Sequence, residues 1–157
     1  MYNSMEETLK HIRLVNENLI KFSKELLDRG IKHDESKLHS PEKELFDELT
    51  PLLENIEYGS PEYKESLNRL KPALDHHYSN NSHHPQYYSN GINGMTLMDI
   101  VEMYCDWKAA FKRTKNGDIN DSITRNAERF DMSEQLEQIF INTVKEENGK
   151  DYNNNNN

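Results

Sequence analysis

Histidine and aspartate residues recur along the chain in a pattern that can build a metal site. In chain order they are His11, His33-Asp34, His76-His77, His83-His84 and Asp106. Neutral imidazoles together with carboxylates suit manganese, iron, zinc, cobalt or nickel. Burying several imidazoles and a carboxylate without a shared partner would be costly, and one or two divalent ions would remove that cost. We therefore expect a divalent metal site.

Helical periodicity indicates which of these histidines face a core. Apolar residues recur at steps of three and four from about Met5 to Asp28, which predicts a helix, and His11 lies near the edge of its apolar stripe. At 100° per residue, His77 lies about 20° from Leu70, whereas His76 lies about 120° from it. We expect His11 and His77 to point inward and His76 to point outward. A single inward histidine is usually an ordinary core residue, so the metal interpretation depends on the whole set.

The elements that carry these residues are helical in pattern. Ser4 is the predicted N-cap of the first helix and Gly30 its stop signal; the later helix starts are predicted at Ser40-Pro41, Ser60-Pro61, Thr96 and Ser133. Turn-forming Asn, Gly and Pro residues over 79–94 predict an ordered loop that carries His83 and His84. No strand alternation occurs. We expect one all-α domain of five to six helices over residues 1–147, followed by a disordered Asn-rich tail over 148–157.

The helix after this loop carries an acidic face. Asp99, Glu102 and Asp106 lie on one side, and the apolar residues lie on the other. Such a face is either solvated or lines a polar metal cavity, and periodicity does not separate these two interpretations. Glu102, one turn before Asp106, could orient a ligand or act as a base.

The segment His33-Asp-Glu-Ser-Lys37 resembles the H-D-x-[GS]-K centre of the HD phosphohydrolase superfamily, with Ser36 where glycine is usual. The order of the remaining histidines and of Asp106 is also similar to that of the ligands in two-metal members. Motifs between about residues 8 and 145 further resemble an uncharacterised family of small bacterial and phage proteins. The resemblance implies an all-helical HD-type fold.

The resemblance also implies roles for single residues. His11, His33, Asp34 and Asp106 would hold one metal ion. Asp34 would bridge to a second ion, which His77 and His83, His84 or both would also hold. Lys37 would contact the phosphate or the attacking water. Lys108 and Arg113 are further candidates for substrate binding, although a surface ion pair is an equal interpretation of Lys108.

The function implied by the resemblance is that of a metal-dependent phosphohydrolase acting on a small phosphorylated molecule, such as a nucleotide. A metal-activated water would attack phosphorus. Two alternatives stay open: a diiron oxygenase on the same scaffold, and a non-catalytic protein that binds metal or senses a ligand.

Composition narrows the classes of partner. The 157 residues carry a formal net charge of −9, and no basic face is present to neutralise nucleic-acid phosphates, so a nucleic-acid polymer is not expected. No run approaches the ~18 apolar residues of a membrane span, and no signal peptide is evident, which predicts a cytoplasmic protein without membrane contact. Cys105 is the only cysteine, which rules out an intrachain disulfide. A homodimer is left open.

Overall fold

The computed structural model describes residues 2–53, 56, 60–111 and 118–154. Within these ranges the elements are α1 (Ser4–Lys32), η1 (Glu35–Leu38), α2 (Glu42–Leu53), α3 (Pro61–Asn80), η2 (Pro85–Tyr87), η3 (Gly91–Gly94), α4 (Leu97–Phe111), α5 (Ile119–Phe130) and α6 (Glu134–Asn154), where η marks a 3-10 helix. No strand occurs in the described ranges, and six α-helices are present, which confirms the all-α prediction.

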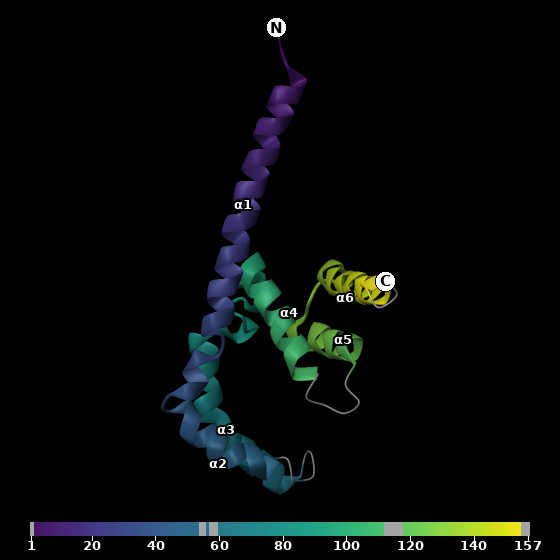
Figure 1. Ribbon diagram of the computed structural model, residues 1–157. Coiled ribbons are helices and arrows are strands. Elements are labelled where there is room, and N and C mark those ends of the chain that lie inside the picture. Colours follow the sequence, from purple (N-terminus) through teal and green to yellow (C-terminus); the bar gives the residue numbers. More distant parts are fainter. Residues whose placement is uncertain (1, 54–55, 57–59, 112–117, 155–157) are drawn as a thin grey trace.

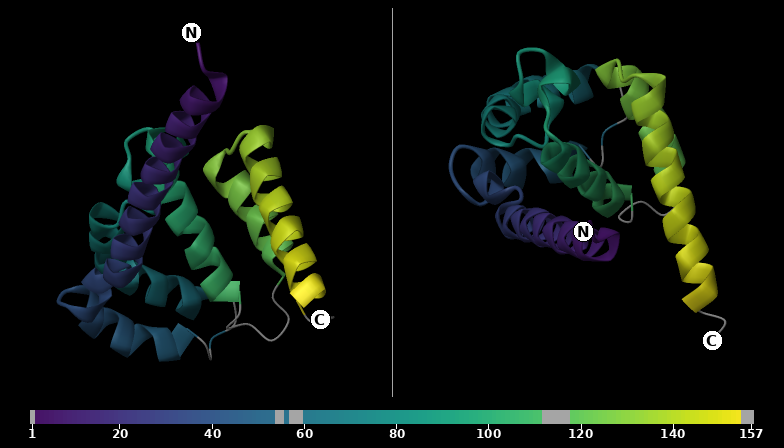
Figure 2. Two further views of the ribbon diagram at one scale, coloured as in Figure 1. Left: turned by 45° about the horizontal axis from the view of Figure 1, so that its top comes forward. Right: turned by 90° about the horizontal axis from the view of Figure 1, so that it is seen from above.

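The helices form two packed groups (Figures 1 and 2). α2 and α3 lie side by side around Leu49, Leu70 and Ala73. α4, α5 and α6 enclose a larger apolar cluster centred on Met103, Trp107, Ile123 and Phe140. The end of α1, the loop after α3 and one face of α4 meet between the two groups. A polar region therefore lies where two separate apolar cores adjoin.

The long helix α1 differs along its length. Its first half stands away from the other helices (Figure 1), and every residue from Ser4 to Lys21 is exposed. Leu19, for example, keeps 60% of its surface accessible. Only the last turns of α1 pack against α4, through half-buried residues such as Leu26 and Arg29. The apolar stripe that predicts the helix is thus buried only near its C-terminal end.

Several predicted helix boundaries need correction. Asn3, rather than Ser4, caps α1, with its Oδ1 atom accepting a hydrogen bond from the Glu6 N–H. Gly30 does not stop the helix, which ends two residues later. The predicted starts at Ser60 and Ser133 are confirmed, because each hydroxyl accepts a backbone N–H of the following turn.

The last helix extends into the segment predicted as a tail. α6 continues to Asn154, so residues 148–154 are helical, and residues 155–157 lie outside the described residues. Composition alone could not anticipate this, because a helix that is already packed can extend through polar residues at little cost. In the described part of the chain, no helix is both long enough and apolar enough to cross a membrane.

Candidate metal centre

The chain turns sharply between α1 and η1, and this turn places the His-Asp pair. His33 is the last cap residue of α1, and Asp34 adopts a left-handed backbone conformation with φ 57° and ψ 17°. The Lys37 N–H closes the turn by donating to the Asp34 carbonyl at 2.9 Å. Left-handed conformations are uncommon for residues other than glycine and concentrate at functional sites. The turn lets both side chains face α3 and α4.

One group of potential metal ligands gathers around Asp34. His77 comes from α3, and His83 and His84 come from the loop after it. The Asp34 Oδ1 atom lies 3.3 Å from His77 Nε2 and 3.4 Å from His83 Nε2. His77 Nε2 in turn lies 2.9 Å from His84 Nε2. One ligand atom from each of the four residues falls within a 4.8 Å span, which is compact enough for one ion.

Two atoms in this group are buried without a hydrogen-bond partner. They are Asp34 Oδ1 and His83 Nε2, the only such side-chain atoms reported in the described part of the chain. The His83 side chain is only 2% exposed. Leaving a buried polar atom unpaired costs about 1–3 kcal/mol, so native proteins rarely do so without a reason. A bound cation would satisfy both atoms at once, and the residues present therefore fit a divalent ion.

A second group lies directly beside the first. It consists of His33, His83 and Asp106, whose ligand atoms also fall within 4.8 Å of one another. His33 Nε2 is 3.6 Å from Asp106 Oδ1 and 3.6 Å from Asp34 Oδ2. His83 thus belongs to both groups, and the two oxygens of Asp34 face one group each. This geometry suits a bridging carboxylate.

Two further carboxylates fix the orientation of the imidazoles. Glu42, at the start of α2 and fully buried, accepts from His77 Nδ1 at 2.9 Å and from His76 Nδ1 at 2.7 Å. Glu102 accepts from His33 Nδ1 at 3.0 Å and lies 3.3 Å from His83 Nδ1. A carboxylate that accepts a hydrogen bond from Nδ1–H keeps the proton of a neutral imidazole on that nitrogen, so that the Nε2 lone pair faces the centre, as metal-ligating histidines require.

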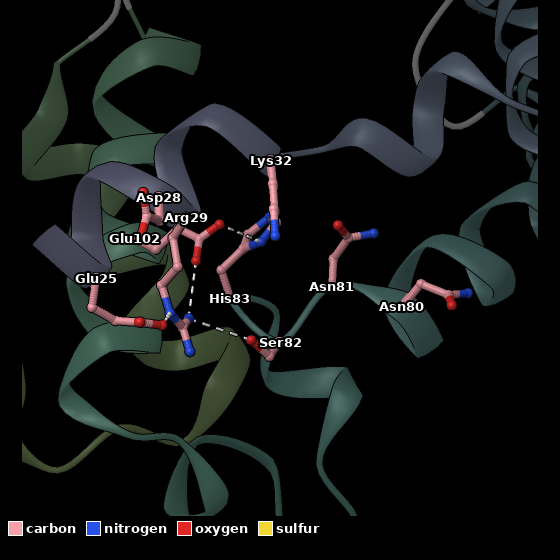
Figure 3. Close-up of a pocket in the computed structure, with 9 residues that line it drawn as sticks. All are labelled: Glu25, Asp28, Arg29, Lys32, Asn80, Asn81, Ser82, His83 and Glu102. Atoms are coloured by element: carbon pink, nitrogen blue, oxygen red, sulfur yellow. Dashed lines mark hydrogen bonds and ion pairs between the residues drawn. The ribbon is translucent and has the colours of Figure 1, made fainter.

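Arg29 ties this arrangement to the rest of the protein. Its guanidinium donates to Glu102 at 3.1 Å and to Asp99 at 2.7 Å, and Figure 3 shows it pointing toward Glu102 and Ser82. Asp99 is fully buried and accepts from Arg29, Ser82, Tyr88 and both the hydroxyl and the N–H of Thr96. The Thr96–Asp99 pair also forms the N-terminal cap of α4. Asp99 therefore holds α1, the loop and α4 together.

The charges of the site divide the histidines into two kinds. The carboxylates of Asp106 and Glu102 raise the pKa of His33 to about 10. Burial lowers the pKa of His84 to about 3, and burial also lowers the pKa of His77. Burial would raise the pKa of Asp34, but nearby His83 and Lys37 outweigh it and hold that pKa well below its usual range. At neutral pH the metal-free site thus offers neutral His77 and His84 beside ionised Asp34.

Residues 1–146 match the sequence model of a family of unknown function, DUF5662. The chain belongs to this family. No curated protein and no solved structure matches it. The match spans every residue of the two ligand groups, so the groups lie inside the segment that defines the family.

The structure brings together six of the seven metal ligands predicted from the sequence. They are His33, Asp34, His77, His83, His84 and Asp106. The prediction that His77 points inward is confirmed, with 2% of its surface exposed. The prediction for His76 holds only in part, because its side chain is 40% exposed while its Nδ1 atom bonds the buried Glu42. His11 is the exception. It lies 22 residues before His33 on one continuous helix, about 33 Å along the axis, and it is exposed. It takes no part in either group.

Of the three residues predicted to contact the substrate, the structure describes two, and it places them differently. Lys37 lies at the site, with its ammonium 2.6 Å from Asp34 Oδ2. Lys108 does not, because its ammonium pairs with Glu147 at 2.7 Å and lies over the Tyr104 ring, on the far side of α4. Arg113 lies outside the described residues. The surface ion pair was the better interpretation of Lys108.

Sequence reasoning missed Glu42 and Arg29 and left Asp99 undecided. Glu42 follows the predicted helix start at Ser40-Pro41, and nothing near it in the sequence indicates that it bonds two histidines 34 and 35 residues later. The acidic face of α4 is not solvated: the side chains of Asp99, Glu102 and Asp106 are 1%, 12% and 29% exposed. The solvated face is therefore contradicted, and a metal cavity along this face stays a prediction.

Proposed function

We propose that the protein is a metal-dependent hydrolase that cleaves small phosphorylated molecules, nucleotides among the candidates. The observation that carries this proposal is the convergence of imidazole Nε2 atoms and carboxylate oxygens around Asp34, with two of these atoms buried and unpaired. A divalent ion at such a site acts as a Lewis acid and lowers the pKa of water toward neutrality.

The chain's own residues supply the remaining requirements. Asp34 reaches both ligand groups with its two oxygens, which sets their separation. Lys37 keeps 40% of its side chain exposed beside Asp34, so its ammonium can meet a phosphate oxygen without leaving the site. Neutral imidazoles add no negative charge, which leaves the centre more attractive to an anionic substrate than a carboxylate-rich site would be.

Partial exposure of the second group favours catalysis over a purely structural metal. The side chains of His33 and Asp106 are 25% and 29% exposed, and both line a cavity that opens to solvent. Structural metal sites are closed by protein ligands, whereas catalytic sites keep an accessible position. A substrate can thus approach the centre from the His33–Asp106 side.

Elemental analysis of protein purified without a polyhistidine tag tests the proposal, followed by assays on phosphomonoesters, phosphodiesters and nucleotides. We expect near-stoichiometric metal in the wild type, little in Asp34→Asn, and hydrolysis of a phosphate ester, measured by chromatography of the products, only by the metal-loaded wild type. No metal before or after reconstitution would overturn the proposal. Iron with an O₂-dependent optical change, and no hydrolysis of any phosphate ester, would replace it with the oxygenase alternative.

A further inference from the structure

A cavity of about 320 Å³ lies between the end of α1 and the outer face of α4, directly beside the second ligand group. Its polar end is formed by His33, Asp106 and Glu102. The remaining wall is apolar and consists of Leu26, Gly30, Val101, Cys105 and Ala109. The cavity therefore joins a potential metal centre at one end to a hydrocarbon surface at the other.

Gly30 helps to create this space. A Cβ atom built at Gly30 would meet no atom within 4 Å, although the residue lies within a regular helix. Glycine is unfavourable inside a helix relative to alanine, so local helix stability does not explain its presence. Together with Ala109 and Cys105 it leaves a concave floor that larger side chains would fill.

The wall chemistry limits what can bind. Hydroxyl or amide groups of a bound molecule would find no donor or acceptor along the apolar wall and would lose their hydrogen bonds to water. A second cavity, of about 390 Å³, is lined by polar residues that include Lys32, Asn80 and Ser82 (Figure 3), but it meets His83 on the side where Glu102 lies. The cavity that reaches His33 and Asp106 is the apolar one.

We propose that this apolar cavity binds the organic group of an aryl or alkyl phosphomonoester, with the phosphate at the His33–Asp106 end. The inference rests on the proposed function and narrows its substrates, because a sugar phosphate or a nucleotide would place polar edges against the apolar wall. Cavities of about 150 Å³ hold benzene, so the volume here accommodates one or two rings. In the reaction, water oxygen bonds to phosphorus, the ester P–O bond breaks, and the departing oxygen takes up a proton. The products are inorganic phosphate and an apolar alcohol.

The variant Gly30→Leu places a side chain in the cavity without replacing a predicted metal ligand. Gly149→Leu is the matched control, because Gly149 is also an exposed helical glycine with open space around its Cβ position. With 1-naphthyl phosphate as substrate, we expect Gly30→Leu to lower kcat/KM by about tenfold or more and Gly149→Leu to leave it within about twofold. Methyl phosphate, which leaves the cavity empty, should be cleaved equally by all three proteins.

Alkylation of Cys105 by iodoacetamide gives a readout that does not require turnover, since this thiol is free and lines the cavity. We expect 1-naphthyl phosphate to slow the alkylation of the metal-loaded wild type and ribose 5-phosphate to leave it unchanged. Protection without any phosphate release would support the cavity assignment and refute the hydrolase. Phosphate release without protection, and without an effect of Gly30→Leu, would overturn the cavity assignment and leave the hydrolase standing.

Discussion

Two aspartates, the buried Asp99 and the half-buried Asp34, differ in how their carboxylate oxygens are satisfied. Asp99 has no exposed surface, and hydrogen bonds from four neighbouring residues occupy its oxygens. Asp34 is bonded by Lys37 at Oδ2, whereas its buried Oδ1 has no hydrogen bond. A carboxylate whose lone pairs are filled stabilises the fold, and one that keeps a buried lone pair free is available to a ligand. The contrast marks Asp99 as a structural aspartate and Asp34 as the candidate metal ligand.

The largest expected effect is the loss of metal affinity in Asp34→Asn. The substitution removes the negative charge of Asp34, whose two oxygens face the two ligand groups, so affinity should fall by more than the loss of about 10–100-fold that is typical of residues that only orient a ligand. Thermal unfolding with and without added metal measures it. At 100 times its dissociation constant a metal stabilises the native state by about 2.7 kcal/mol, and this gain should disappear in the variant. An unchanged metal-induced shift would remove Asp34 from the site.

Asp99→Ala should show the opposite pattern. It leaves Arg29, Ser82 and Tyr88 without their shared acceptor, and the expected loss in the free energy of unfolding is about 2–3 kcal/mol. Added metal should still raise the melting temperature of this variant. Asp121→Ala, at an exposed position on α5, is the control and should change stability by about 0.5 kcal/mol or less. If Asp99→Ala abolished the metal-induced shift while leaving the fold intact, the two aspartates would have been assigned the wrong way round.

A smaller loss of metal affinity is expected on substitution of Glu102, which contacts both the hydrogen-bond network of Asp99 and the candidate metal centre around Asp34. It accepts from Arg29 in the structural network and from His33 in the site. Glu102→Gln keeps its size but weakens its hold on the Nδ1 protons, so metal affinity should fall by about 10–100-fold with little loss of helix content. The control is Glu147→Gln, because Glu147 lies on α6, which packs on the far side of α4, and this variant should leave metal affinity unchanged. Isothermal titration of both variants decides this.

The pH dependence should separate the two networks further. The folded pKa of His33 is raised to about 10, so its proton stabilises the metal-free protein fully below about 6.5, and this contribution is lost as the pH rises toward 10. Metal binding must displace that proton, so metal affinity should rise over the same interval. Hydrogen bonds hold the pKa of Asp99 below its usual range despite burial, and its contribution is lost only as the pH falls below about 4. Urea unfolding at several pH values, with and without metal, tests the opposite slopes.

Much of the site could be predicted from the sequence because most of its ligands occur near helix ends and in one short loop. His77 follows from helical phase, and the His33-Asp34 pair follows from its motif. The orienting carboxylates could not be predicted in the same way. Glu42 meets His77 only because α2 and α3 pack against each other, and no periodicity within either helix reports that contact. The same limit applies to His11, whose phase on α1 is that of an inward residue although, among the described residues, none buries that half of the helix.

The smallest expected effect is therefore that of His11→Ala. His11 and His33 share one helix, but about 33 Å of helix separates them, and His11 makes no contact with either ligand group. Metal affinity and the metal-induced rise in melting temperature should equal those of the wild type, whereas His33→Ala should lower both. A loss of metal in His11→Ala would mean that the exposed half of α1 reaches a metal centre outside its own chain, and sedimentation analysis of the metal-loaded protein would then show a larger assembly than a monomer.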